Sequence, residues 1–144
     1  MEISFVSYSN GPICFNDRDL VKDLYKKKEL FFEYFPNIRF SRENDFIGLQ
    51  LDIDCKDKKE SVGHIGFLIG VEIKGWTEKI KEIEDLKKGK DLLEPLCLYL
   101  IKETQGIVAA RTADLLGFPL LFPPIPINDF IEKTLITDST PKKS

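Results

Sequence analysis

The chain has 144 residues, of which 42% are hydrophobic and 31% are charged, and its formal net charge is −3. This length and composition are typical of one folded domain with its own core. The acidic balance argues against a general nucleic-acid-binding protein, because such a protein carries a basic excess.

The three cysteines, Cys14, Cys55 and Cys97, are far apart, and the only histidine is His64. A structural zinc site needs four ligands, usually in close pairs, so we expect no metal and no other cofactor. An odd number of scattered cysteines is typical of reduced thiols in a cytosolic protein. The first residues lack a basic region followed by an apolar run, and no window is apolar enough for a membrane span. We therefore expect a cytoplasmic protein without a signal peptide.

The N-terminal part predicts a broken strand and a polar segment. Apolar residues at 1–6 and at 13–15 are typical of strand, and the turn-forming residues 9–12 separate them. Residues 17–30 are charge-dense and carry only a weak helical stripe. We expect a loop or a short helix there.

An aromatic strand is predicted at 31–35, with a turn after it at 36–37 and a continuation of the strand beyond. Phe31 and Phe35 share one face of this strand, and Phe32 shares the other with a tyrosine. One aromatic face can join the core. The other needs a cover, which could be a partner, a ligand or the proline-rich segment near the C-terminus.

Strict alternation predicts the next two strands, at 46–55 and 64–76. Each has one apolar face and one polar or small face. A short charged connection at 56–61 predicts that the two strands pair antiparallel. The apolar positions are Ile47, Leu49, Leu51, Ile53, Cys55, Ile65, Phe67, Ile69, Val71 and Ile73.

After this strand the spacing of apolar residues becomes helical. Thr77 is predicted as the N-cap of a short helix and Gly89 as its stop. A longer helical stripe runs over 92–116, and Gly117 is predicted to close it. Strands followed by helices predict an α+β fold, with an antiparallel sheet covered on one face.

The most apolar run, "GFPLLFPPIPI" at 117–127, contains four prolines and can form neither a helix interior nor a central strand. Such a stiff segment is either a simple cover over apolar surface or a wall of a peptide-binding groove. Residues 128–135 predict a short helix or turn. We expect a single domain at 1–136 and a flexible tail at 137–144.

Catalytic candidates are weak. Asp52 and Asp54 share one strand face like a carboxylate pair for metal or acid–base chemistry, but alternation places them on the wet face. An exposed strand-end residue is the simpler interpretation of His64. The glycines of that strand fit no phosphate loop, because no Gly-Lys-Ser/Thr follows them. We expect that the protein is not an enzyme.

Small residues step along one face of the long helix. A glycine inside a helix costs about 1 kcal/mol relative to alanine, so a packing reason is expected. This face either rests on the sheet or packs helix against helix between subunits. The oligomer interface expected in the second case is Gly106, Ala109, Ala110 and Ala113.

The C-terminal third resembles the SecB family of export chaperones. After the sheet and a long helix, that family has Gly-Phe-Pro, an apolar stretch, Pro-Pro and a short helix with Asn-Phe or Asp-Phe. Here "GFP" at 117–119, "PPI" at 123–125 and "NDF" at 128–130 are similar. The strands "EISF", "ICF", "GLQLDID" and "GFLIGVEIKGW" resemble the family's strands more loosely, so the resemblance covers most of the chain.

The resemblance implies a four-stranded antiparallel Greek-key-like sheet, followed by a long helix and a short C-terminal helix. It also implies a homotetramer, made as a dimer of dimers through the long helices, and ATP-independent capture of unfolded or precursor polypeptides in protein export. Docking to the export motor stays open, because Pro12 and Asn16 stand where the family has acids. The expected client-binding residues are Phe31, Phe32, Phe35, Phe118, Leu120, Leu121, Phe122 and Ile125.

A second interpretation, from a different class, is a small inhibitor or immunity-type protein that binds one folded partner. It predicts one specific partner and no general holdase activity. The chaperone interpretation predicts the reverse.

Overall fold

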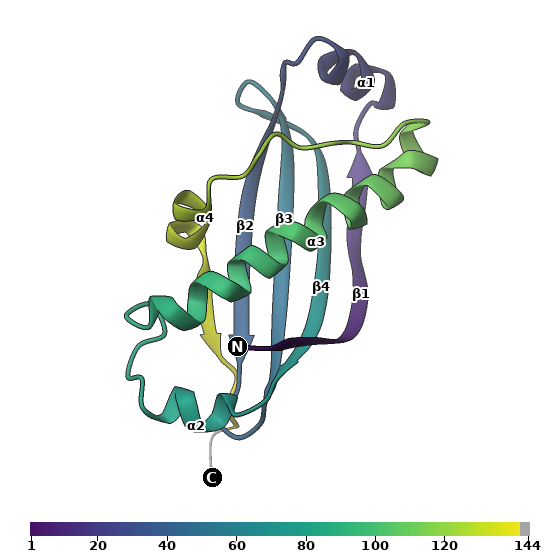
Figure 1. Cartoon of the computed structure of the whole chain (residues 1–144). Helices are drawn as coiled ribbons and strands as arrows, with labels where there is room; N and C mark the ends of the chain where they lie inside the picture. The colour runs from purple at the N-terminus through teal and green to yellow at the C-terminus, as the bar shows by residue number, and fades with distance from the viewer. Residues whose placement is uncertain (142–144) are drawn as a thin grey trace.

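The computed structural model describes residues 1–141, which form a five-stranded sheet with helices on one face (Figure 1). The predicted α+β class is confirmed, with strands followed by a long and a short helix. The strands are β1 (Ile3–Phe15), β2 (Leu30–Phe40), β3 (Phe46–Asp57), β4 (Glu60–Ile73) and β5 (Leu135–Asp138). The helices are α1 (Arg18–Lys26), α2 (Trp76–Lys81), α3 (Lys90–Leu116) and α4 (Ile127–Lys133).

The order across the sheet is β1-β4-β3-β2-β5. β2, β3 and β4 follow one another as antiparallel hairpins, and β1 lies antiparallel beside β4, which is a Greek-key order. α1 lies at the top of the sheet, in the connection from β1 to β2 (Figure 1). The short strand β5 is an addition to the expected four strands, and it pairs with β2 in parallel from Asn37 to Phe40.

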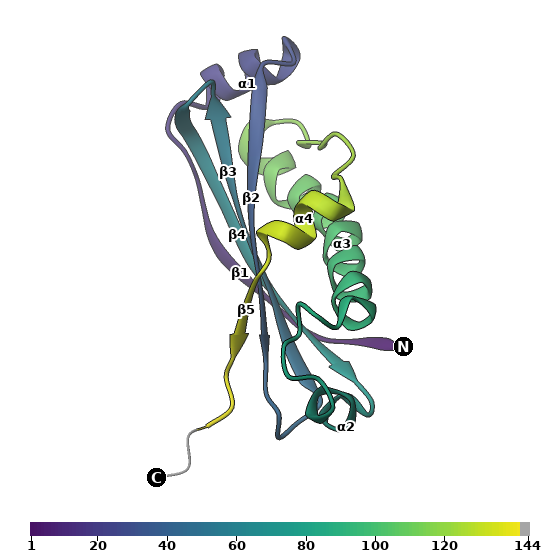
Figure 2. The same ribbon diagram turned by 90° about the vertical axis from the view of Figure 1, so that its left-hand side faces the viewer.

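The core lies between the sheet and α3, and Figure 2 shows both α3 and α4 on that side. The apolar positions predicted from alternation in β3 and β4 are all buried. α3 covers them with a buried stripe that includes Leu96, Leu100 and Val108. No helix of residues 1–141 lies on the opposite face of the sheet, which we call the outer face (Figure 2).

Two predicted breaks lie inside continuous strands. The residues at 9–12 belong to β1, whose register with β4 shifts between Asn10 and Ile13, so the strand bulges instead of ending. Gly11 is required at this bulge, because a Cβ there would lie 2.8 Å from the backbone of Gly66. Pro36 lies inside β2 rather than in a turn. β5 begins to pair only at the next residue, so Pro36 needs no partner on that side.

The polar segment 17–30 contains a true helix, α1. Its N-cap Asp17 accepts hydrogen bonds from the backbone N–H groups of Asp19 (3.0 Å) and Leu20 (3.1 Å). At the other end of the helical region, Gly117 closes α3 in the left-handed conformation (φ +79°), as predicted.

The predicted ends of the short helix were wrong. α2 starts one residue before Thr77 and ends at Lys81, whereas Gly89 directly precedes α3. The cap of α2 comes from the connection between β2 and β3. Asp45 accepts hydrogen bonds from the backbone N–H groups of Gly75 (3.3 Å) and Thr77 (3.1 Å), so no local side chain is needed.

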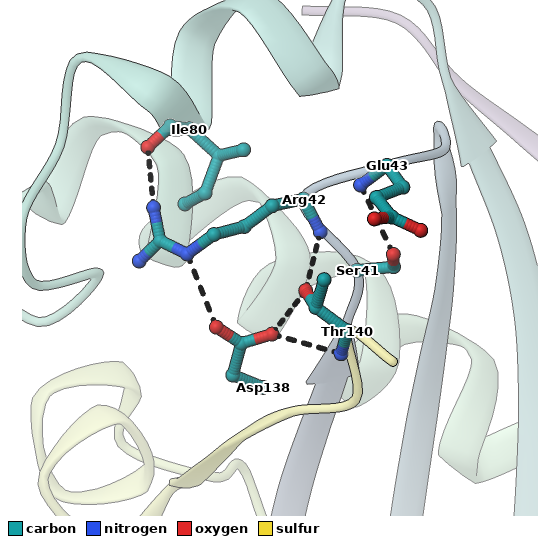
Figure 3. A network of polar contacts seen from close by, with 6 residues as sticks. All are labelled: Ser41, Arg42, Glu43, Ile80, Asp138 and Thr140. Atoms are coloured by element: carbon teal, nitrogen blue, oxygen red, sulfur yellow. Dashed lines mark hydrogen bonds and ion pairs between the residues drawn. The ribbon is translucent and has the colours of Figure 1, made fainter. Parts of the chain in front are cut away.

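The last described residues are bound to the sheet (Figure 3). Asp138 accepts hydrogen bonds from the hydroxyl and backbone N–H of Thr140 and from Nε of Arg42 (3.1 Å). A guanidinium nitrogen of Arg42 also donates to the carbonyl of Ile80 (3.2 Å). The tail expected at 137–144 therefore begins inside β5, and its residues 142–144 lie outside the described part.

Candidate binding groove

The proline strap, which we define as residues 117–126, connects α3 to α4 across the helix-bearing face of the sheet (Figure 1). Its prolines have no N–H, but residues 120–122 do, and a side chain satisfies each of these groups. The acceptors are Thr112 Oγ1 for Leu120 (2.9 Å), the Tyr25 hydroxyl for Leu121 (3.3 Å) and Gln105 Oε1 for Phe122 (3.1 Å). Side chains of α1 and α3 thus hold the strap where a neighbouring strand would otherwise be needed.

The inward side chains of the strap belong to the core. Phe122 is buried, and its ring meets Phe32 edge-on, with centroids 4.6 Å apart. Leu120 is also buried, and Phe118 packs against Tyr25 at a centroid distance of 5.1 Å. Leu120 and Phe122 were both expected to contact a client, but in this structure the protein's own core surrounds them.

The surface between the strap and β2 is hollowed. A hollow of about 610 Å³ lies at the α1 end, and a second of about 220 Å³ continues towards α4. We call the two together the β2 groove, because they share lining residues from β2 and the strap. The shared residues are Leu30, Phe31, Phe32 and Pro123. Further lining comes from Tyr25, Lys26, Lys28, Leu121, Tyr34, Pro124, Ile125 and Pro126.

One wall of this groove is an open strand edge. β2 pairs with β3 over its whole length, whereas β5 covers its other side only from Asn37 onward. No strand among residues 1–141 pairs with 30–36 on that side. Such an edge presents backbone N–H and C=O groups that can bind an added extended chain.

The structure brings four of the eight expected client-binding residues together in the groove. Two of them are large and well exposed, since Phe31 has 58% and Leu121 56% of its surface accessible. Phe35 is also exposed but does not line the groove. The four groove residues are Phe31, Phe32, Leu121 and Ile125.

Sequence reasoning missed the contribution of α1 to the groove. Tyr25, Lys26 and Lys28 line the larger hollow, although they come from the segment read as a loop or short helix. The sequence signal that could have indicated this contribution is Tyr25, the single aromatic residue of that polar segment. An isolated aromatic ring in a charged helix needs an apolar neighbour, which here is Phe118.

Tyr34 places an unpaired polar atom in the core behind the groove. Its hydroxyl is buried and has no hydrogen-bond partner among the described residues. Burial raises the pKa of Tyr34 above its ordinary value, and the nearby Cys55 adds to the shift. The hydroxyl therefore stays protonated, and the core around it closes it off from the groove.

Part of the small-residue face of α3 does not rest on the sheet. Gly106 and Ala110 are exposed, and a Cβ added to Gly106 would meet no atom within 4 Å. Ala109 and Ala113 are half-buried. The interpretation that this face rests on the sheet is therefore wrong for Gly106 and Ala110. Another backbone has room to approach the helix there.

The weak catalytic candidates lie on the outer face of the sheet. His64 Nε2 is 3.3 Å from Asp52 Oδ1, and Asp54 accepts a hydrogen bond from the Ser61 hydroxyl. In the described part of the chain no three His, Cys, Asp or Glu side chains are placed to hold a metal ion. The three candidates thus form a half-buried polar row across β3 and β4.

Neither the models of known protein families nor the curated protein sequences include a match to this chain. Among residues 1–141, no helix combines the length and apolar character needed to cross a membrane.

Proposed function

We propose that this protein is an ATP-independent holdase, similar to the SecB chaperones of protein export, that binds unfolded or precursor polypeptides in the β2 groove. The observation that carries the proposal is that an open strand edge at 30–36 lies beside an apolar wall at 121–126. Catalysis and cofactors have no part in it.

The chemistry of the groove suits extended, non-native segments. The open edge of β2 can bind any backbone, because backbone groups are the same in every sequence. Phe31 and Leu121 supply apolar surface, and burial of one large side chain contributes about 1.5–3 kcal/mol before ordering costs. Several such contacts along one chain produce useful affinity with little sequence demand.

Light scattering with a chemically denatured client tests this proposal. We expect the protein to suppress aggregation, and Leu121→Ser to weaken the suppression. Leu135→Ser is the matched control, because Leu135 is exposed to a similar degree (64%) but lies on β5 and does not line the groove. Unchanged aggregation at excess wild-type protein would reject the holdase. If one specific partner were then captured, the inhibitor or immunity-type alternative would be favoured.

Self-association into a tetramer is the second part of the proposal. The exposed Gly106 and Ala110 on α3 support it, because small residues let two helices approach closely. They border a hollow of about 430 Å³ between α3 and β1. Sedimentation should show an oligomer that Ala110→Trp splits and that Lys22→Trp on α1 leaves intact. A strict monomer at micromolar concentration would reject this part.

A cytoplasmic location is the third part. All three cysteines are free, and Cys14 is exposed. An exposed free thiol suits a reducing compartment, because oxidising compartments favour disulfides. Fractionation of cells that make the tagged protein would test it, and recovery outside the cytoplasm would contradict it.

A further inference from the structure

The α1 end of the β2 groove combines an apolar interior with a basic rim. Lys26 and Lys28 are exposed, and both line the larger hollow beside Tyr25, Phe31 and Leu121. A lysine next to apolar surface lays its carbon chain along that surface and keeps its ammonium group in water. The two ammonium groups therefore flank the place where apolar side chains of a bound segment would lie.

Two acidic residues near this rim are neutralised by lysines. Asp23 is paired with Lys27 at 2.9 Å, and Glu33 with Lys56 at 2.6 Å. The hydrogen bond from Lys56 lowers the pKa of Glu33, so this carboxylate stays ionised and paired.

By contrast, Lys26 and Lys28 make no ion pair within residues 1–141. Glu29 follows them in the chain but is not among the residues that line the groove. The rim of the larger hollow therefore keeps a positive charge, although the whole chain is acidic.

We infer that the β2 groove selects among unfolded segments by charge and favours apolar segments flanked by aspartate or glutamate. This inference rests on the proposed function and names the substrate class of the same site. A flanking carboxylate that leaves the apolar interior meets the ammonium groups of Lys26 and Lys28 at the rim. A flanking lysine meets like charges there and is disfavoured.

Three unlabelled peptides test the inference by isothermal titration calorimetry. They share a Leu-Phe-Leu core and carry flanks of Asp-Glu, Ser-Ser or Lys-Lys. At low salt we expect the acidic peptide to bind about threefold to tenfold more tightly than the serine peptide, which lies within the range for two exposed ion pairs. The lysine peptide should bind most weakly. The differences should shrink at high salt, because the Debye length falls from about 10 Å at 0.1 M to about 3 Å at 1 M.

Variants of the rim separate charge from folding. The double variant Lys26→Gln with Lys28→Gln should lose the preference for the acidic peptide and keep its affinity for the serine peptide. Lys22→Gln is the matched control, because Lys22 is an exposed lysine of α1 that neither lines the groove nor makes an ion pair within residues 1–141, and it should keep the preference. Circular dichroism should show both variants folded.

The two possible failures can be told apart. Equal binding of the acidic and serine peptides at low salt would overturn the inference and leave the groove as a peptide site. Loss of the preference in Lys22→Gln but not in the double variant would also overturn it. If none of the three peptides binds, the proposed function itself fails.

Discussion

Gln105 holds the backbone of Phe122 by both halves of its side-chain amide. Nε2 donates to the Phe122 carbonyl at 2.8 Å, and Oε1 accepts the Phe122 N–H at 3.1 Å. This is the pair of bonds that a residue of a neighbouring strand would make. One side chain of α3 thus replaces a strand for the proline strap, and it fixes the wall of the β2 groove.

Replacement of Gln105 by alanine should destabilise the fold by about 1–3 kcal/mol, because two partly buried backbone groups lose their partners. Urea unfolding measures the loss. Gln50→Ala is the matched control, since the Gln50 amide makes one side-chain hydrogen bond, to Asp52 at 3.1 Å, and should cost under about 0.5 kcal/mol. Equal losses in the two variants would show that the strap does not depend on Gln105.

Thr112→Val should cost about 1–3 kcal/mol, although the two side chains have almost the same shape. The Thr112 hydroxyl accepts the N–H of the buried Leu120 at 2.9 Å, and valine would leave that group unpaired. Thr104→Val is the control. Thr104 is equally buried and donates to the carbonyl of Leu100 at 2.6 Å, but no backbone N–H of residues 1–141 bonds to it. A larger loss at Thr104 than at Thr112 would contradict the prediction.

Tyr34→Phe should leave stability unchanged or raise it by up to about 1 kcal/mol, because it removes a buried hydroxyl without a partner. The ring would keep its contacts with Phe122 and Phe130. Tyr25→Phe should instead lose about 0.5–1.5 kcal/mol, since its hydroxyl accepts the Leu121 N–H. Thermal unfolding of the two variants checks the contrast, and a clear loss at Tyr34 would disprove it.

Stability should fall in alkaline solution. Burial raises the pKa of Cys55 to about 12 and that of Cys97 to about 11, from an ordinary thiol value of 9.0. Above about pH 9 the unfolded chain releases its thiol protons, whereas the folded chain keeps them until the pH approaches the raised pKa values. The stabilising effect is therefore complete below about pH 9 and is lost as the pH rises towards the folded-state values. Urea midpoints at increasing pH measure the decline, and a midpoint that rises above pH 9 would refute it.

Thiol labelling at neutral pH should separate the cysteines in one experiment. Cys14 is exposed and should react fast with a maleimide, whereas Cys55 and Cys97 are buried and should react only after unfolding. Cys14→Ser should therefore abolish the fast phase. A fast phase that survives in this variant would mean that the core opens readily.

Local patterns were enough to predict the centre of the fold. Strict alternation identified the buried faces of β3 and β4, because a pleated strand with one wet face leaves a period of two. Gly117 was also predictable as the end of α3, since a left-handed residue is most easily a glycine. Both features depend only on neighbours along the chain.

The remaining features depend on residues far apart in sequence. Asp45 caps α2 across a whole hairpin, so the sequence around Thr77 pointed to the wrong cap. Pro36 looked like a turn because nothing local shows that β5 stops one residue short of it. For the same reason half of the groove was predicted, namely the strap and β2, while its basic end at 25–28 was missed.

The short parallel strand β5 also sets a length. It occupies the β2 edge from Asn37 to Phe40 and leaves residues 30–36 without a strand partner on that side, which at 3.3 Å per residue is an edge of about 23 Å. An extended chain added beside β2 would run into β5 at Asn37, and at the other end it would reach α1. The fold therefore limits the length of any chain that pairs with this edge. Because Asp138 and Arg42 hold β5 in place, residues outside the groove determine how long a segment the groove can accept.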